Sequence, residues 1–207
     1  FLIEKRYLRQ EMTTRLAHAL GERGALVDII TPQDCQFEPE IGLLKNQNGA
    51  VYRLDKYDMI VPRIRSPFGL ALLSYADAAR IPIVNSNAGV KKARNKTEVA
   101  IALARAGIRT APTILADEAS VLAELPADWY PLILKAIHGD NSQGLRLIRR
   151  PEDLDLISWG DDLVLAQHYL PNDGLDLKLY ACGKTVFASR KPSPFNGTPG
   201  ATLEPIQ

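Results

Sequence analysis

The most informative stretch of this 207-residue chain is Pro131-Leu-Ile-Leu-Lys135-Ala-Ile137 with the loop that follows it, His138-Gly139-Asp-Asn-Ser-Gln-Gly144. Its apolar part predicts a short strand over 132–137, and the run after the loop predicts a second strand over 145–149. Lys135 interrupts the apolar part four residues before Gly139. Because an ammonium group in an apolar strand needs a partner, we expect either a neighbouring Asp or Glu or a bound phosphate beside Lys135.

The loop holds two glycines, Gly139 and Gly144, around four polar residues. Glycines let a loop present its backbone N–H groups to an anion without obstruction by side chains. The spacing matches that of a P-loop, but a P-loop continues with Lys and Ser or Thr into a helix, whereas this loop continues into a strand. A P-loop is therefore excluded. A plain hairpin connection and an anion-binding loop both stay open.

Upstream of this stretch, segments with helical spacing alternate with segments typical of strands. We expect helices over 11–21 and 70–80, and strands over 25–30, 58–62 and 82–84. Such alternation predicts a mainly parallel sheet that is covered by helices.

From Asn95 onward the pattern predicts helices and antiparallel strands. A helix over 97–106, with Thr97 as its N-cap and Gly107 after its end, precedes a strand over 112–115 and a helix over 117–125. Another helix begins at Pro151, strands follow over 163–169, 175–182 and 185–190, and the tail predicts a loop. We expect three parts: an α/β domain over 1–87, a lobe with the glycine loop over 88–165, and the start of a second lobe over 166–207.

The composition is that of a globular chain, with 46% hydrophobic and 24% charged residues and a net charge of +1. This balance argues against a general nucleic-acid or membrane-surface binder. The apolar runs are far shorter than the ~20 residues of a membrane helix, and no signal peptide opens the chain, so we expect a cytoplasmic protein. Cys35 and Cys182 have no metal-ligand spacing and predict reduced thiols.

Four motifs resemble, in their order, those of the ATP-grasp superfamily and, within it, of the RimK-type carboxylate–amine ligases. They are Asn95-Lys96-Thr-Glu-Val with Ala-Gly107-Ile-Arg-Thr-Ala-Pro112-Thr, the Lys135 strand with its loop, Leu163-Val-Leu-Ala-Gln167-His-Tyr-Leu170, and Gly174-Leu-Asp176-Leu-Lys178. A further segment, Tyr57-Asp-Met-Ile-Val-Pro62-Arg63, resembles the end of the domain that precedes the ATP-grasp lobe. The resemblance implies a Rossmann-like α/β domain followed by an α+β lobe with antiparallel sheets.

The same resemblance implies an ATP site between two antiparallel sheets. Lys96 and Lys135 would neutralise the α- and β-phosphates, and a glycine loop would close over the triphosphate through Gly139, Asp140, Ser142, Gln143 and Gly144. The adenine edge would meet Gln167 and the backbone of His168, Tyr169 and Leu170, and Asp176 would accept a hydrogen bond from the ribose. Two alternatives stay open. Gln167 and Tyr169 are then half-buried sheet residues, and Asp176 is the partner of a lysine.

The implied reaction joins a small-molecule or peptide carboxylate to an amino-acid amine through an acylphosphate made with ATP. Both steps develop negative charge on oxygen, so fixed cations are the expected catalysts. We predict Lys178 and Arg190 for this role, with a solvated face as the alternative, and set Lys191 aside because adjacent strand residues face opposite sides. Arg63, Arg65 and Ser66 follow a predicted parallel strand, where ligands tend to bind, and we expect them to hold the carboxylate.

The resemblance also implies two Mg²⁺ ions, held by an Asp or Glu and by a Glu-x-Asn motif near the C-terminal end. Hard divalent ions prefer carboxylates, but downstream of Asp176 the sequence has one acidic residue, Glu204, in a segment without a strand pattern. We therefore assign no metal ligand in this chain and expect the metal-binding segment to lie outside it.

Two other functions stay open. An ATP-grasp kinase of the inositol-phosphate type needs a strongly basic pocket, for which Lys91, Lys92 and Arg94 are candidates, although a solvated face also accounts for them. A nucleotide-binding module without catalysis is the other alternative. A homo-oligomer also stays open.

Overall fold

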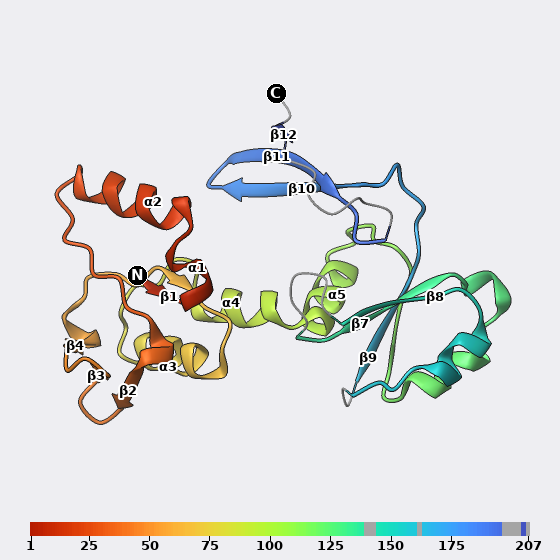
Figure 1. Cartoon of the computed structure of the whole chain (residues 1–207), viewed down its shortest axis with the longest axis horizontal. Helices are drawn as coiled ribbons and strands as arrows, with labels where there is room; N and C mark the ends of the chain where they lie inside the picture. Colours follow the sequence, from red (N-terminus) through yellow and green to blue (C-terminus); the bar gives the residue numbers. More distant parts are fainter. Residues whose placement is uncertain (139–143, 161–162, 196–203, 206–207) are drawn as a thin grey trace. The chain divides into compact units, whose positions relative to one another are not determined.

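The computed structural model describes residues 1–138, 144–160, 163–195 and 204–205 (Figure 1). The chain forms two compact units, Phe1–Arg94 and Asn95–Gln207. The finer division with boundaries after residues 87 and 165 stays a prediction. Within the described ranges, no helix combines the length and the apolar character that crossing a membrane requires.

Parallel pairing organises the first unit. Strand β1 (Leu2–Ile3) pairs with β5 (Pro62–Arg63), and single parallel bridges join Leu2 to Ile30 and Ile60 to Ile83. The predicted parallel arrangement is thus present. The strands predicted over 25–30 and 82–84 were too long, because pairing is limited to these bridges; Ile30 is buried whereas Leu26 is fully exposed.

Four helices accompany these strands: α1 (Lys5–Leu8), α2 (Glu11–Gly21), α3 (Pro67–Ala78) and α4 (Asn87–Arg94). Ser66 starts α3, since its Oγ accepts a hydrogen bond from the Gly69 amide at 3.1 Å and Pro67 occupies the first turn, where a missing N–H costs little. Short 3-10 helices lie at Pro32–Asp34 (η1) and Leu54–Lys56 (η2).

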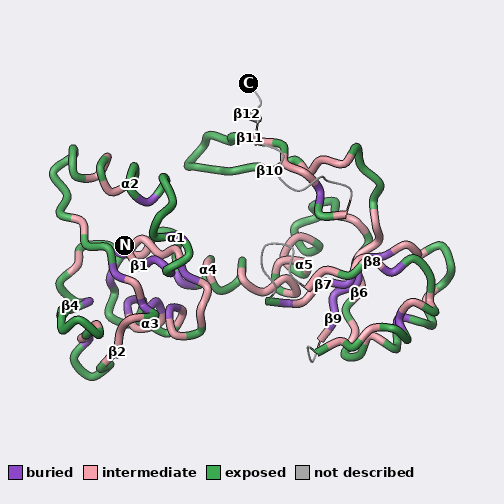
Figure 2. The backbone as a smooth tube through the Cα atoms, in the orientation of Figure 1, coloured by how far each residue is buried: buried purple, intermediate pink, exposed green. Residues whose placement is uncertain are grey.

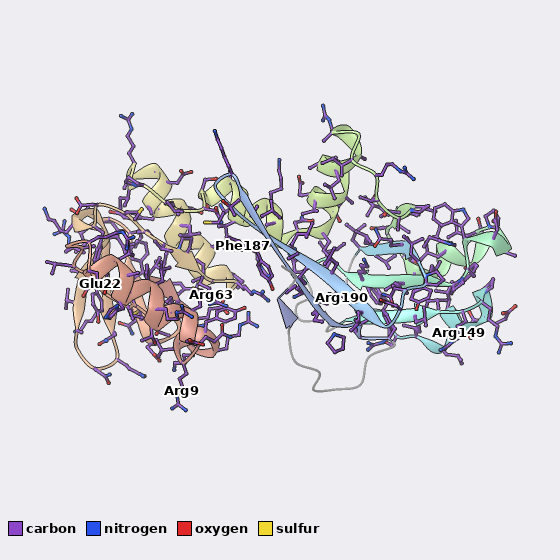
Figure 3. All side chains as sticks on the ribbon, turned by 90° about the horizontal axis from the view of Figure 1, so that it is seen from above. Arg9, Glu22, Arg63, Arg149, Phe187 and Arg190 are labelled. Carbon is purple, nitrogen blue, oxygen red and sulfur yellow. The ribbon has the colours of Figure 1, made fainter. Side chains whose placement is uncertain are left out.

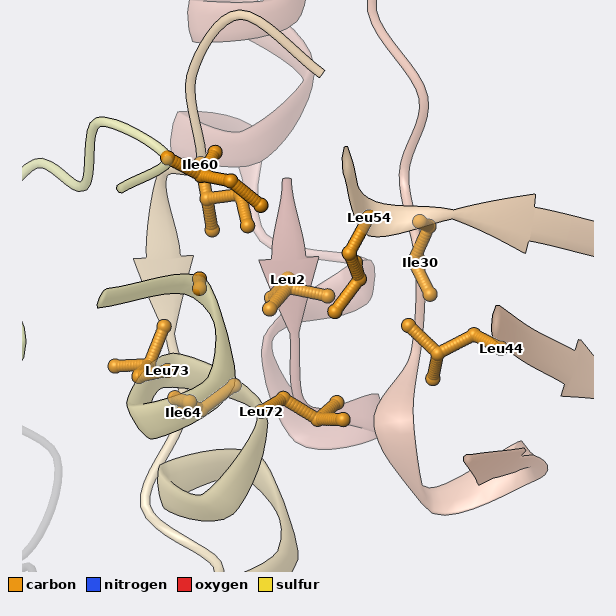
Figure 4. Close-up of a cluster of buried hydrophobic side chains, with 10 residues drawn as sticks. Leu2, Ile30, Leu44, Leu54, Ile60, Ile64, Leu72 and Leu73 are labelled. Atoms are coloured by element: carbon orange, nitrogen blue, oxygen red, sulfur yellow. The ribbon is translucent and has the colours of Figure 1, made fainter. Parts of the chain in front are cut away.

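An antiparallel sheet that the sequence analysis did not predict completes this unit. Its strands are β2 (Cys35–Glu38), β3 (Leu43–Asn46) and β4 (Val51–Arg53), in that order. The core joins this sheet to the parallel strands and α3, and Figure 4 shows Leu2 of β1 between Leu73 of α3 and Leu44 of β3. These three side chains are 2%, 0% and 0% exposed, so the core includes both kinds of sheet.

The second unit begins with α5 (Lys96–Arg105). Its N-cap is Asn95, not Thr97 as predicted, because the Asn95 side chain accepts hydrogen bonds from the amides of Thr97 (2.9 Å) and Glu98 (3.2 Å). Gly107 follows the helix in the left-handed region, with φ +65°, as its predicted position after the helix end requires.

Two antiparallel sheets make up the rest of this unit. The first contains β6 (Thr113–Ala116), β7 (Leu132–Ala136), β8 (Leu145–Ile148) and β9 (Val164–His168) in the order β6-β9-β7-β8. The second contains β10 (Leu175–Cys182), β11 (Thr185–Pro192) and β12 (Glu204–Pro205) in chain order. The loop predicted around Glu204 is therefore wrong at this point, since β12 pairs with Ser189 and Arg190 of β11.

One face of the four-stranded sheet is buried under 3-10 helices. Helix η3 (Ala119–Glu124) replaces the α-helix predicted over 117–125, and η4 (Ala127–Trp129) and η5 (Pro151–Leu156) follow in the chain. The core on this face consists of Leu122, Leu132, Leu134, Ile148, Leu154, Val164 and Ala166, and Figure 2 shows these buried stretches in purple. Because side chains alternate along a strand, the intervening residues of β7 and β9 face the other way.

Candidate functional site

Lys135 lies on the face of the four-stranded sheet that is opposite this core. Its neighbours there by register are Ile133, Leu145, Leu165 and Gln167. The ammonium donates a hydrogen bond to Gln167 Oε1 at 2.5 Å. Gln167 Nε2 in turn donates to Thr113 Oγ1 at 2.9 Å, which fixes the orientation of the amide. A polar chain across β7, β9 and β6 thus crosses an otherwise apolar face.

The charge on Lys135 has no ion-pair partner among the described residues. Burial lowers the pKa of Lys135, and the negative charge of Asp176 opposes this shift from beyond ion-pairing distance. The sequence predicted either a carboxylate or a bound phosphate beside Lys135. The direct partner in the structure is instead the neutral amide of Gln167. The ammonium can therefore still neutralise an anion at this face.

Lys96 reaches the same end of β7. Its Nζ donates to the carbonyl of Ala136 at 3.0 Å, and its backbone amide donates to the carbonyl of Ile137 at 3.2 Å. These bonds fasten the start of α5 to the residues directly after Lys135. The structure thus brings together two lysines that are 39 positions apart, 135 less 96, in the sequence.

Gly144 closes the base of the glycine loop against β7. Its carbonyl accepts a hydrogen bond from the Ala136 amide at 3.2 Å. Its φ is +72°, and a Cβ added there would lie 2.9 Å from the Ala136 Cβ, so a larger residue would be both strained and obstructed. The other predicted loop residues, Gly139, Asp140, Ser142 and Gln143, lie outside the described residues.

The segment predicted to meet adenine uses two of its backbone amides within the protein. His168 donates its N–H to the carbonyl of Pro112 and Tyr169 donates to that of Pro131, both at 2.9 Å. His168 also faces the core side of the sheet, where its ring nitrogen Nδ1 lies 3.2 Å from the Trp129 carbonyl. Neither N–H is free for a ligand in this arrangement, whereas Leu170 follows β9 with 58% of its surface exposed.

The β10–β11 hairpin places the predicted catalytic cations on opposite faces. Its register sets Asp176 opposite Lys191 and Lys178 opposite Ser189, so these four side chains share a face. Asp176 forms an ion pair with Lys191 at 3.4 Å. Arg190, which is labelled in Figure 3, belongs to β11. It lies opposite Leu177 on the other face and pairs with Asp173.

Lys178 and Arg190, the predicted catalytic cations, therefore lie on opposite faces of the hairpin, and Lys191 shares a face with Lys178. Their catalytic role stays a prediction. The reason for the shared face is the two-residue turn between Cys182 and Thr185, which pairs even-numbered residues of β10 with odd-numbered residues of β11. Alternation decides which residues share a face within one strand. Between two strands, the register decides it.

Several known proteins are similar to this chain in sequence. No family model matches the chain. A probable alpha-L-glutamate ligase of Pasteurella multocida is 28% identical over 199 residues, covering 88% of this chain and 64% of that protein. The ribosomal protein bS6–L-glutamate ligase of Salmonella schwarzengrund is 27% identical over 188 residues, covering 84% and 61%. The chain thus spans less than two thirds of the length of these two relatives.

A solved structure is similar over more of the chain. The RimK domain ATP-grasp protein of Sphaerobacter thermophilus superimposes with a TM-score of 0.70 at 18% identity, covering 92% of this chain and 72% of that one. The chain has the ATP-grasp fold. The fold predicted from the four motifs is confirmed, and Lys96, Lys135 and Asp176 lie in the ATP-grasp unit, Asn95–Gln207.

The unit that precedes the ATP-grasp unit holds the predicted carboxylate-binding residues. Glu4, 3% exposed, accepts hydrogen bonds from the backbone amides of Arg65 and Ser66 and so fixes the turn after β5. Arg63 and Arg65 both lie over the ring of Tyr7, with Cζ 4.4 and 5.6 Å from its centroid. The Ser66 hydroxyl already caps α3. The sequence analysis did not predict Glu4 or Tyr7. The position of Glu4, directly after a short apolar segment, was the signal that could have identified it.

The candidate metal and polyanion sites take less definite form. Among the described residues, no group of three His, Cys, Asp or Glu side chains gathers as a metal ion would require. Lys91 and Lys92 are exposed on α4, and Lys91 donates to Ser74 Oγ at 2.8 Å. An exposed helix face, rather than a basic pocket, accounts for these two lysines.

Proposed function

We propose that this chain is the nucleotide-binding part of an ATP-dependent ligase that joins a carboxylate to an amine. The observation that carries the proposal is the half-buried ammonium of Lys135. It has an amide and no carboxylate as its direct partner within the described chain, on an apolar sheet face beside Lys96. A planar adenine suits the apolar part of that face, and a phosphate suits the charge.

The residues present fit ATP in two respects. Lys96 and Lys135 supply positive charge at one end of β7, and the φ of +72° at Gly144 lets the backbone close on that end without a side chain. Mg²⁺ would accompany the triphosphate and neutralise its charge; its ligands stay unassigned among the described residues. Gln167, held by Thr113, keeps the Lys135 ammonium at a set position on the sheet.

In the proposed reaction a carboxylate oxygen takes the γ-phosphoryl group, ADP leaves, and an amine then displaces phosphate and loses a proton to give the amide. Negative charge develops on oxygen in both steps. Lys178 and Lys191, which share the Asp176 face of the hairpin, are the cations that we propose to stabilise it. The relatives are named as L-glutamate ligases, so L-glutamate is the first amine and carboxylate to test, with a peptide end as the second. Use of ATP places the proposed activity in the cytoplasm.

The decisive experiment is a thermal-shift titration of the full chain with ATP, with and without Mg²⁺. At ATP concentrations well above Kd, we expect Tm to rise by about 5 °C or more in the wild type. The shift should disappear in Lys135→Met and persist in Lys184→Met, which removes an exposed lysine from the hairpin turn of the same unit. No shift in the wild type would refute nucleotide binding by this chain.

Product analysis then separates the proposed ligase from the alternatives. Release of ADP and phosphate together with an amide supports the ligase, and a phosphorylated alcohol would indicate a kinase. An ATP shift without any turnover over a panel of amino acids and peptides would leave a nucleotide-binding module. The exposed positions of Lys91 and Lys92 favour the ligase over the kinase.

A further inference from the structure

The buried carboxylate of Glu4 organises a cluster of arginines in the first unit. Glu4 Oε1 accepts the amides of Arg65 and Ser66, and Oε2 accepts Arg6 Nε at 2.9 Å. Arg6 Nη2 lies 2.8 Å from the same oxygen. Both Glu4 oxygens are thus engaged by the backbone and by Arg6. The guanidinium of Arg63 receives no ion pair from Glu4.

Tyr7 provides the surface on which the arginine side chains rest. It is 7% exposed, and the Cζ atoms of Arg63, Arg6 and Arg65 lie 4.4, 5.0 and 5.6 Å from its ring centroid. Arg63 and Arg65 flank Ile64, and whereas Ile64 is buried in the core, both guanidinium groups lie over the Tyr7 ring. A ring face attracts a guanidinium but leaves its charge and its in-plane N–H donors available.

Arg63 Nη1 and the Tyr7 hydroxyl are buried and have no hydrogen-bond partner among the described residues. Buried donors in native proteins are nearly always paired, and an unpaired one carries a desolvation cost. Burial also lowers the pKa of Arg65, and the positive charges of Arg94 and Arg6 add to that shift. An anion that accepts hydrogen bonds here would pair the buried donors. Its negative charge would also oppose the burial and the positive charges that lower the pKa of Arg65.

We propose that Arg63 and Arg65, supported by Tyr7 and held by Glu4, form a binding site for the carboxylate group of a substrate. The forked guanidinium matches a planar carboxylate through two parallel hydrogen bonds. The site lies directly after β5, at the end of a parallel strand, where α/β folds bind ligands. That the bound carboxylate is the one that reacts rests on the proposed ligase function. The binding of a carboxylate by these arginines does not.

The test titrates the full chain with glutarate, and in parallel with inorganic phosphate, by isothermal calorimetry without ATP. Glutarate should bind the wild type, and Arg63→Met should weaken it by about tenfold or more, since a charge-assisted pair is lost. Tyr7→Phe should weaken it by about threefold, the loss of one ordinary hydrogen bond. Arg15→Met is the matched control, because it removes an exposed arginine that pairs with Glu11 on α2.

Arg63→Lys keeps the charge and loses the fork, so intermediate affinity supports bidentate recognition even if Arg63→Met folds poorly. Unchanged glutarate affinity in folded Arg63→Met and Arg63→Lys would overturn the proposal. Phosphate binding more tightly than glutarate, and sensitive to Arg63, would overturn the carboxylate assignment.

The ATP thermal shift, measured on the same samples, separates this proposal from the proposed function. Glutarate binding without an ATP shift refutes the nucleotide site and supports the arginine site. An ATP shift without glutarate binding does the reverse.

Discussion

Burial of the Lys135 ammonium carries a cost in stability. Its pKa in the folded chain is lowered from 10.5 by burial, so the folded state loses the proton before the unfolded state does as the pH rises. Below the folded pKa, both states are charged and the cost of burying the ammonium is fully present. Between the folded pKa and 10.5, the unfolded state binds more protons, and the stability of the folded state therefore increases with pH.

We therefore expect Lys135→Met to be at least as stable as the wild type near neutral pH. The difference in free energy of unfolding should shrink as the pH approaches 10.5, because the wild type loses its burial cost there. Urea unfolding at about pH 7.5, 9 and 10.5 measures this difference. A gap between the two proteins that does not change with pH would contradict the expectation.

At the same scale, the sequence predicted the need of Lys135 for a partner but not the partner. Gln167 is 32 positions away, 167 less 135, and meets Lys135 only through the pairing of β7 with β9. Which of Arg190 and Lys191 shares a face with Lys178 was not predictable for the same reason, since cross-strand register follows from the turn and not from the residue types.

Among the elements, α5 depends on a cap that also positions a lysine. Asn95→Ala removes the acceptor for two amides and should cost about 1 kcal/mol in the free energy of unfolding. It should also weaken ATP binding, because Lys96 is the first residue of this helix. Urea unfolding and the ATP thermal shift measure the two effects.

Thr97→Ala is the control for this cap. The Thr97 hydroxyl is buried without a hydrogen-bond partner among the described residues, so its removal should cost less than about 0.5 kcal/mol. A larger loss for Thr97→Ala than for Asn95→Ala would restore Thr97 as the cap.

The β10–β11 hairpin gives a second expectation at this scale. Lys191→Met and Lys178→Met should each lower the rate of amide formation by about tenfold or more, since both lie on the Asp176 face. Arg190→Met removes an equal charge from the opposite face and should change the rate by less than about twofold. Steady-state rates of the three variants test this, and a large effect of Arg190→Met alone would contradict the assignment of faces.

Elements with a marked apolar pattern were predictable from the sequence, and elements without one were not. Helix α2 and the strands of the four-stranded sheet follow from apolar spacing. The sheet of β2, β3 and β4 was missed because its strands bury few side chains, among them Leu44. Without a run of buried apolar residues, a strand leaves little periodic signal in the sequence.

At the scale of the whole molecule, the two units have separate cores. Leu72 belongs to the core of the first and Leu134 to that of the second, and both are 0% exposed. Replacing either by Ala should cost about 2–5 kcal/mol. We expect two unfolding transitions in calorimetry, with Leu72→Ala lowering one and Leu134→Ala the other.

ATP should raise the transition that Leu134→Ala lowers, because Lys135 is the next residue of the same strand. A single transition that both substitutions lower equally would contradict independent unfolding of the units. The order of the ATP-grasp motifs predicted the fold of this unit, whereas the arginine cluster on Tyr7 required the pairing of β1 with β5.

Ala136 imposes a constraint on anyone who redesigns the glycine loop. Its carbonyl holds the Lys96 ammonium, its amide holds the Gly144 carbonyl, and its methyl group fills the space that a Gly144 side chain would need. A larger residue at position 144 would therefore press on the Ala136 methyl group and displace the strand end that fixes Lys96. Loop libraries that replace Gly144 have to allow for this contact at position 136.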